Sequence, residues 1–174
     1  MLFRSPIFWF SPHNVYGENQ NIGDRYRNVI GIFMNQIMQG KPMTVFGDGT
    51  QTRAFTYIDD VAPYIANSVN IPKAYNEVFN IGADEPYTVQ RLAESVAQAF
   101  GVAPRIRHLP ARNEVLHAYA DHAKARRILG QEGTVGLEEG IERMAAWARQ
   151  VGARKGQEFR DIEVLERLPA SWRS

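Results

Sequence analysis

Residues 41–60, KPMTVFGDGTQTRAFTYIDD, decide how the rest of the chain is interpreted. Residues 43–46 make a short extended run, residues 47–49 supply a glycine-rich turn, and residues 54–58 return in extended form. An Asp-Gly turn between two β-prone runs predicts a β-hairpin, because glycine adopts the positive φ that such turns need. Arg53 lies near the start of the return strand, where it is placed to hold an anion such as a diphosphate.

The composition is that of an ordinary globular protein. Its 174 residues, 44% hydrophobic and 22% charged, predict one domain with a hydrophobic core. The formal charge of +1 gives no basic field for nucleic acid, and no apolar run is long enough to span a bilayer. Cysteine is absent, which excludes disulfides and a thiolate nucleophile. Because Arg4 and Pro6 interrupt the apolar start, we expect no signal peptide and a soluble cytoplasmic protein without nucleic-acid or membrane partners.

Short strands alternate with helices along the chain, which predicts an α/β fold. Buried strands are predicted at residues 6–10 and 78–82, and an edge strand at residues 105–109. Helices are predicted over residues 27–40, 61–69, 88–101, 122–129 and 137–152. Either Asp59 or Asp60 can cap the second of these helices, and Thr88 can cap the third.

Two apolar stripes indicate which helical faces are buried. The first helix carries its stripe on Ile30, Phe33, Met34, Ile37 and Met38, and the second on Val61, Ile65 and Val69.

There are too few strong strands for a complete doubly wound sheet, so a complete N-terminal Rossmann domain is not expected. We predict a small mixed α/β domain with about five helices over residues 1–152, of which residues 1–11 are an orphan strand. The tail, residues 153–174, is predicted to dock on this domain through Leu165, Leu168, Pro169 and Trp172.

The residues indicate no self-sufficient active site. G-x-G-x-x-G, the P-loop and the G-x-S-x-G elbow are all absent. The four histidines, at positions 13, 108, 117 and 122, show no metal-type spacing with carboxylates. Glu138 and Glu139 fall in a first helical turn, where the helix dipole favours acids. We therefore assign no catalytic and no metal-binding residue.

A set of ordered motifs does carry a resemblance. They are NVYG at 14–17, VIGIF at 29–33, PMTVFGDGTQTRAF at 42–55, YIDDV at 57–61, VFNIG at 78–82, YAD at 119–121, LEEGI at 137–141 and LPASW at 168–172. Together they resemble the C-terminal half of the NAD-dependent nucleotide-sugar epimerase/dehydratase family, the extended short-chain dehydrogenases. That resemblance implies an N-terminal Rossmann domain that holds NAD and a smaller domain that closes over a nucleotide diphosphate sugar.

The resemblance also implies roles for individual residues. Asn14 would contact the phosphates or the sugar, and the backbone at Asn28 and Val29 would help to hold the substrate. Met43, Val45 and Phe46 would surround the base, and Arg53 and Asn80 would bind the diphosphate. Arg112 would contact phosphate, and Glu114 would contact the ribose or the sugar. The family motif Arg-Pro-Gly-Glu is replaced here by ARNE at 111–114, with the arginine shifted by one position. Without the resemblance, Arg53 is a surface arginine and the asparagines are turn or strand-end residues.

The family's catalytic machinery is missing from this sequence. No tyrosine has a lysine four residues later, so Tyr-x-x-x-Lys is absent, as is the glycine-rich NAD fingerprint. The leading hypothesis is a truncated epimerase/dehydratase-like protein that binds a nucleotide-diphosphate sugar, binds no NAD by itself, and is inactive alone. The alternatives are a non-catalytic binding or homo-oligomerising module, half of a split enzyme completed by a separate Rossmann chain, and an inert gene fragment.

Overall fold

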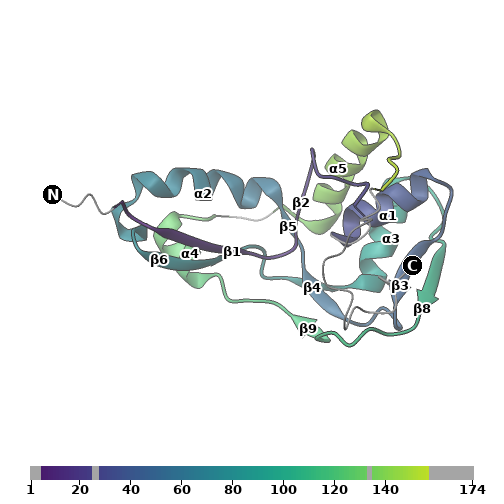
Figure 1. The fold of residues 1–174 in the computed structure, drawn as a ribbon, viewed down its shortest axis with the longest axis horizontal. Helices are drawn as coiled ribbons and strands as arrows, with labels where there is room; N and C mark the ends of the chain where they lie inside the picture. The colour runs from purple at the N-terminus through teal and green to yellow at the C-terminus, as the bar shows by residue number, and fades with distance from the viewer. Residues whose placement is uncertain (1–4, 25–27, 133–134, 157–174) are drawn as a thin grey trace, which may run out of the picture.

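The computed structural model describes residues 5–24, 28–132 and 135–156. They form an elongated molecule with two lobes joined by short strands (Figure 1). The small lobe contains β1 (Phe8–Pro12), α2 (Ala62–Asn67), β6 (Glu77–Ile81) and α4 (Ala123–Leu129). The large lobe contains α1 (Val29–Met38), β3 (Met43–Phe46), α3 (Val89–Ala99), β8 (Ile106–Leu109) and α5 (Leu137–Val151). Between them lie β2 (Val15–Tyr16), β4 (Thr52–Ala54), β5 (Thr56–Tyr57), β7 (Pro86–Thr88) and β9 (His117–Ala118).

The predicted fold class is confirmed: within the described ranges the chain is a small α/β structure with five α-helices and short strands. Three short 3₁₀ turns, η1 (Ile58–Asp60), η2 (Ser68–Asn70) and η3 (Pro72–Ala74), surround α2. Each lobe has its own hydrophobic core. The larger core lies between α1, α3 and α5, and the smaller one lies beneath β6 and α4.

The long helices begin and end where the sequence indicates. The Thr88 hydroxyl accepts a hydrogen bond from the Arg91 amide at 3.0 Å and so caps α3. In α1, Ile30, Phe33 and Met34 of the predicted stripe are fully buried, because this face packs against α3 and α5. Glycines with positive φ follow α1, α3, α4 and α5, at positions 40, 101, 130 and 152, as expected of helix C-caps.

The predicted hairpin at residues 41–60 is wrong. The turn forms, with Gly47 and Gly49 at φ values of 70° and 82°, but β3 does not pair with the return segment. Instead, β3 pairs in parallel with β8, and β4 pairs antiparallel with β7 and in parallel with β9. Gln51 separates the two runs, and its side chain donates to the Phe46 carbonyl at 2.9 Å. The turn signal was therefore local, whereas the strand partners come from residues between about 30 and 65 positions later.

The strands β1 and β6 pair in parallel, but neither is buried on both faces as predicted. Phe79 and Ile81 of β6 are fully buried, whereas Trp9 is 65% exposed and Val78 is 58% exposed. Trp9 and Val78 are register partners, and nearby Ile7 is 68% exposed. One face of this two-stranded sheet is therefore apolar and open, although parallel sheets are normally covered on both faces.

The predicted cap at Asp59 or Asp60 is also wrong. Residues 58–60 form η1, and α2 begins without a side-chain cap. The Asp60 carboxylate is buried and accepts a hydrogen bond from the Val135 amide at 2.8 Å, so it ties the chain before α2 to the segment before α5. Burial raises the pKa of Asp60, and this hydrogen bond opposes the increase. Val69, predicted to be buried, is 56% exposed because η2 ends the helical stripe early.

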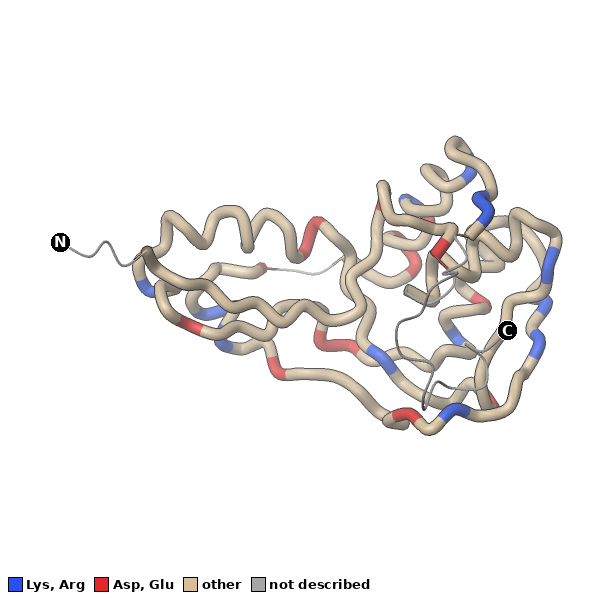
Figure 2. The backbone as a smooth tube through the Cα atoms, in the orientation of Figure 1, with Lys and Arg blue, Asp and Glu red and all other residues tan. Residues whose placement is uncertain are grey.

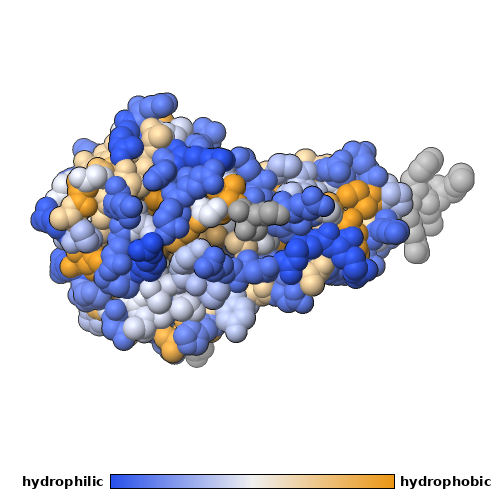
Figure 3. Space-filling model, turned by 180° about the vertical axis from the view of Figure 1, so that it is seen from behind, coloured by the Kyte–Doolittle hydropathy of each residue, from blue (hydrophilic) through white to orange (hydrophobic). Residues whose placement is uncertain are grey.

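Charges of both signs occur at both ends of the molecule (Figure 2), and apolar residues reach the surface in separate places (Figure 3). No helix among the described residues has the length and apolar character needed to cross a bilayer. Residues 154 and 155 follow α5, and the Arg154 amide donates to the Asn35 side chain at 2.9 Å. The tail contacts predicted for Leu165, Leu168, Pro169 and Trp172 lie outside the described residues.

Candidate functional site

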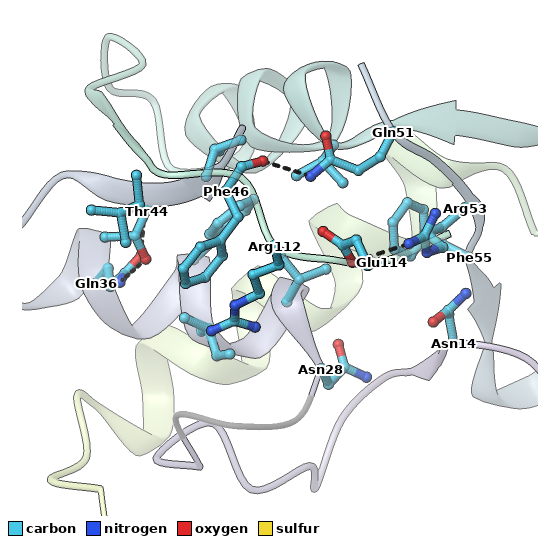
Figure 4. A pocket seen from close by; sticks show the side chains of 16 residues that line it. Asn14, Asn28, Gln36, Thr44, Phe46, Gln51, Arg53, Phe55, Arg112 and Glu114 are labelled. Atoms are coloured by element: carbon cyan, nitrogen blue, oxygen red, sulfur yellow. Dashed lines mark hydrogen bonds and ion pairs between the residues drawn. The ribbon is translucent and has the colours of Figure 1, made fainter. Parts of the chain in front are cut away.

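A cavity of about 650 Å³ lies in the large lobe, beside α1 and the turn after β3. Its lining combines an apolar wall with a few amides and charged groups, as ligand sites commonly do. The lining residues are Asn14, Asn28, Val29, Ile32, Phe33, Gln36, Thr44, Val45, Phe46, Gln51, Arg53, Phe55, Val89, Leu109, Arg112 and Glu114 (Figure 4).

Most of the predicted substrate-binding residues meet at this cavity. Asn14, Asn28, Val29, Val45, Phe46, Arg53, Arg112 and Glu114 line it. Met43 and Asn80 lie elsewhere: Met43 is buried in the large core, and Asn80 is exposed on β6 opposite Ser11. Three consecutive residues of β3, Thr44, Val45 and Phe46, line the cavity, so it is reached from both faces of this strand and does not extend to Met43. Their binding roles stay predictions.

Two asparagines in left-handed backbone conformations form one side of the cavity. Asn14 has φ 41° and donates from Nδ2 to the Ala54 carbonyl at 2.9 Å. Asn28 has φ 57°, donates to the Val15 carbonyl at 2.6 Å and accepts from the Ile30 amide as the cap of α1. Asparagine tolerates this backbone region better than most residues. The two side chains therefore fix the loop before α1 against the central strands.

Arg53 is held rigidly at the cavity edge. Its Nη1 donates to the carbonyls of Thr52 at 2.7 Å and Leu116 at 3.1 Å. Its Nη2 donates to the Val115 carbonyl at 2.7 Å and to Glu114 Oε2 at 3.1 Å. The Arg53 side chain is only 17% exposed, against 40% for Glu114. Three backbone carbonyls thus position the guanidinium, and one carboxylate supplies its counter-charge.

A second arginine covers an aromatic wall of the cavity. The Arg112 guanidinium carbon lies 3.4 Å from the centre of the Phe46 ring, which is a cation–π contact. Figure 4 shows both side chains. Burial lowers the pKa of Arg112, and the charge of Glu114 opposes that change. Arginine stays charged in either case. The cavity therefore contains two guanidinium groups and one carboxylate.

The sequence interpretation assigned Val29 to the binding site but missed Ile32, Phe33 and Gln36 of the helical wall of the cavity. Val29, Ile32, Phe33 and Gln36 follow the i, i+3, i+4, i+7 spacing, so they form one stripe of α1, which shares Phe33 with the buried stripe. Gln36 donates to the Thr44 hydroxyl at 2.9 Å and accepts from the Thr44 amide at 3.0 Å. The sequence signal that could have indicated this wall is a second stripe of the helix that ends in a polar residue, Gln36.

A buried histidine lies outside this cavity, between the lobes. His122 is fully buried, and its Nδ1 lies 2.7 Å from Asp84 Oδ1, while Arg126 also contacts Asp84. Burial raises the pKa of Asp84, but the hydrogen bond with His122 and the charge of Arg126 outweigh this and lower it below its usual value. The described residues contain no group of three or more His, Cys, Asp or Glu side chains placed to hold a metal ion.

The comparison with protein families agrees with the resemblance of the sequence motifs. A family model described as "NAD dependent epimerase/dehydratase family" matches residues 3–82, which include β1, Arg53 and the VFNIG strand. The matched range is just under half of the chain, and over it the chain is similar to the epimerase/dehydratase family.

Individual relatives agree with this assignment. The chain is 31% identical over 153 residues to the UDP-glucuronate 4-epimerase of Thermodesulfobacterium geofontis, covering 81% of this chain and 46% of that protein. Among solved structures, it is similar to UDP-glucose 4-epimerase with UDP-glucose from Thermotoga maritima. That match has a TM-score of 0.73 and 31% identity, and it covers 82% of this chain and 45% of the other.

A second solved structure is UDP-glucuronic acid 4-epimerase from Bacillus cereus in complex with UDP-glucuronic acid and NAD. Its TM-score is 0.75 at 31% identity, and the match covers 84% of this chain and 46% of the other. The chain thus spans about half the length of the relatives that it matches.

Proposed function

We propose that this chain binds a nucleotide-diphosphate sugar in the cavity beside α1. The observation that carries the proposal is Arg53, a guanidinium that three backbone carbonyls fix at the edge of a cavity of about 650 Å³. A pre-positioned arginine suits a diphosphate, because its planar fork makes paired, charge-assisted hydrogen bonds with phosphate oxygens.

The remaining walls suit the rest of such a ligand. Val45, Phe46 and Leu109 offer an apolar slot for a base, and Arg112 beside them adds a second positive charge. Asn14 and the α1 N-terminus lie on another side and provide polar groups for phosphate or sugar oxygens. The Thermotoga and Bacillus relatives contain UDP-sugars, which makes a uridine ligand the first to test.

The described residues do not fit an NAD site. A dinucleotide site needs a glycine turn that leads from a strand into a helix N-terminus. The positive-φ glycines here instead follow helices, or lie in the turn at Gly47 and Gly49 and in the loop at Gly17. We therefore propose that this chain holds no NAD alone and does not catalyse the family reaction alone. A cytoplasmic location remains part of the proposal.

The test has two parts, both on the purified chain. A thermal-shift screen with UDP-, dTDP-, GDP- and CDP-sugars should raise the melting temperature with at least one of them, since a ligand that binds only the folded state stabilises it. Incubation of the same ligands with NAD should yield no product. No stabilisation by any ligand would refute the binding proposal, and an epimerised or dehydrated product would refute the inactivity.

A second candidate function rests on the open apolar face of β1 and β6. Ile7, Trp9 and Val78 are exposed there, and exposed apolar patches commonly mark interaction sites. The candidate is a binding or interaction module that forms a homo-oligomer, or half of a split enzyme that a separate Rossmann chain completes. Light scattering on the chain alone tests the homo-oligomer. An activity assay after co-expression with a separate Rossmann chain tests the split enzyme. A monodisperse monomer without activity after co-expression would contradict both.

A further inference from the structure

We propose that Glu114 is an internal anion that occupies Arg53 in the free chain and competes with a bound diphosphate. This inference rests on the proposed function, because it concerns the same cavity. It differs from the role that the family resemblance implies for Glu114, which is contact with ribose or sugar hydroxyls. The dashed line between the two side chains in Figure 4 marks the ion pair in question.

The contacts of Arg53 show which of its partners can leave. The carbonyls of Val115 and Leu116 belong to a segment that β9 ties to β4, where Thr52 pairs with His117 and the Thr52 amide donates to the Leu116 carbonyl at 2.9 Å. The Leu116 carbonyl is fixed by this pairing, and Val115 is the residue directly before it, so neither acceptor moves away without a change in the backbone. The Glu114 carboxylate is held at 3.1 Å by Arg53 and is 40% exposed, so it can rotate into water.

The exchange of anions costs little and leaves Arg53 in place. A partly exposed ion pair contributes little to stability, because water solvates the released carboxylate well. After Glu114 leaves, the carbonyls of Thr52, Val115 and Leu116 still orient the guanidinium. One Nη2 hydrogen is then available to a phosphate oxygen, and the site loses a negative charge that would repel the ligand.

The same short segment also holds Arg112 against Phe46. Arg112 and Glu114 are two residues apart, and the Glu114 amide donates to the Arg112 carbonyl at 3.0 Å in a tight turn. The cation–π contact with Phe46 anchors this turn at the apolar wall. The turn therefore keeps the carboxylate within reach of Arg53, and the Glu114 side chain, rather than the backbone, carries out the exchange.

Calorimetric titration with inorganic pyrophosphate tests the inference, because pyrophosphate has neither ribose nor sugar. Glu114→Gln should bind pyrophosphate about two- to five-fold more tightly than the natural chain, the range expected from the loss of a partly exposed ion pair. Glu142→Gln makes the same charge change on the exposed face of α5 and should bind like the natural chain. Melting temperatures of both variants should stay close to that of the natural chain.

The outcomes separate this inference from the proposed function. If a UDP-sugar binds the natural chain but Glu114→Gln binds pyrophosphate equally well or less well, the competition is refuted and the binding site stands. A loss of UDP-sugar binding in Glu114→Gln without any gain for pyrophosphate would instead support contact with hydroxyl groups and overturn the inference. If neither chain binds pyrophosphate or any nucleotide sugar, the inference and the proposed function both fail.

Discussion

Gly140 in α5 lies directly against two tyrosines, and its replacement by alanine is a direct test of the packing between α5 and the central strands β2 and β5. A Cβ at this position would overlap the Tyr16 hydroxyl and lie 2.9 Å from Tyr16 Cζ and 3.0 Å from Tyr57 Cδ2. Both rings are buried, and their centres are 5.6 Å apart at an interplanar angle of 71°. Tyr16 is two residues from Asn14, so this contact also positions one wall of the cavity.

The expected loss of stability follows from two opposing effects. Overpacking a close-packed interior costs about 1–3 kcal/mol. Alanine favours a helix interior over glycine by about 1 kcal/mol. The difference is about 0–2 kcal/mol, and because both rings are buried we expect Gly140→Ala to lose the upper part of it, about 1–2 kcal/mol of unfolding free energy. For a chain of this size, that loss lowers the melting temperature by about 3–6 °C.

The assay is thermal and urea unfolding followed by circular dichroism. Tyr16→Phe in the Gly140→Ala background removes the hydroxyl that the new Cβ meets, so it should recover part of the loss. Glu142→Ala, on the exposed face of the same helix, is the control and should change stability little. A Gly140→Ala chain as stable as the parent would refute the close approach of α5 to Tyr16.

Three further predictions concern local contacts. Thr88→Ala removes the hydroxyl that caps α3 through the Arg91 amide and should cost about 1 kcal/mol in urea unfolding; an unchanged midpoint would contradict the cap. The Asp84 pKa is lowered from 3.8 in the folded chain, so the folded state binds fewer protons than the unfolded state, and the stabilisation by Asp84 is complete above about pH 4 and lost as the pH falls below it. Asp84→Asn should therefore flatten the decrease of melting temperature in acid, and an equally steep decrease would exclude the contact with His122 as its cause. If the open sheet face joins copies of this chain, Trp9→Glu should lower the mass measured by light scattering to that of a monomer, whereas an unchanged oligomer would exclude that face.

The helices could be predicted from sequence because their signals are local. The stripe of α1 at Ile30, Phe33 and Met34 and the cap at Thr88 depend only on residues a few positions apart. The cavity residues Arg53, Phe46 and Asn28 could be selected from sequence through a family resemblance. Periodicity and composition do not predict that these three residues lie in one cavity.

The strand pairs and the buried carboxylate could not be predicted in this way. β3 pairs with β8 and β4 with β7 and β9, so the sheet partners are set by chain packing rather than by the turn at Gly47 and Gly49. Asp60 precedes α2 as a helix cap would, but its carboxylate binds the Val135 amide, 75 residues away. Such contacts leave no periodic signal in the sequence.

The central claim is that Arg53 at this cavity holds the diphosphate of a nucleotide sugar. Calorimetric titration of UDP-glucose into the natural chain, Arg53→Ala and Arg127→Ala tests it most directly, because Arg127→Ala makes the same charge change on the exposed surface of α4. Arg53→Lys, which keeps the charge but not the planar fork, controls for any loss of folding in Arg53→Ala. The account predicts saturable binding by the natural chain and by Arg127→Ala, weaker binding by Arg53→Lys, and none by Arg53→Ala. Equal binding by Arg53→Ala and the natural chain would contradict it.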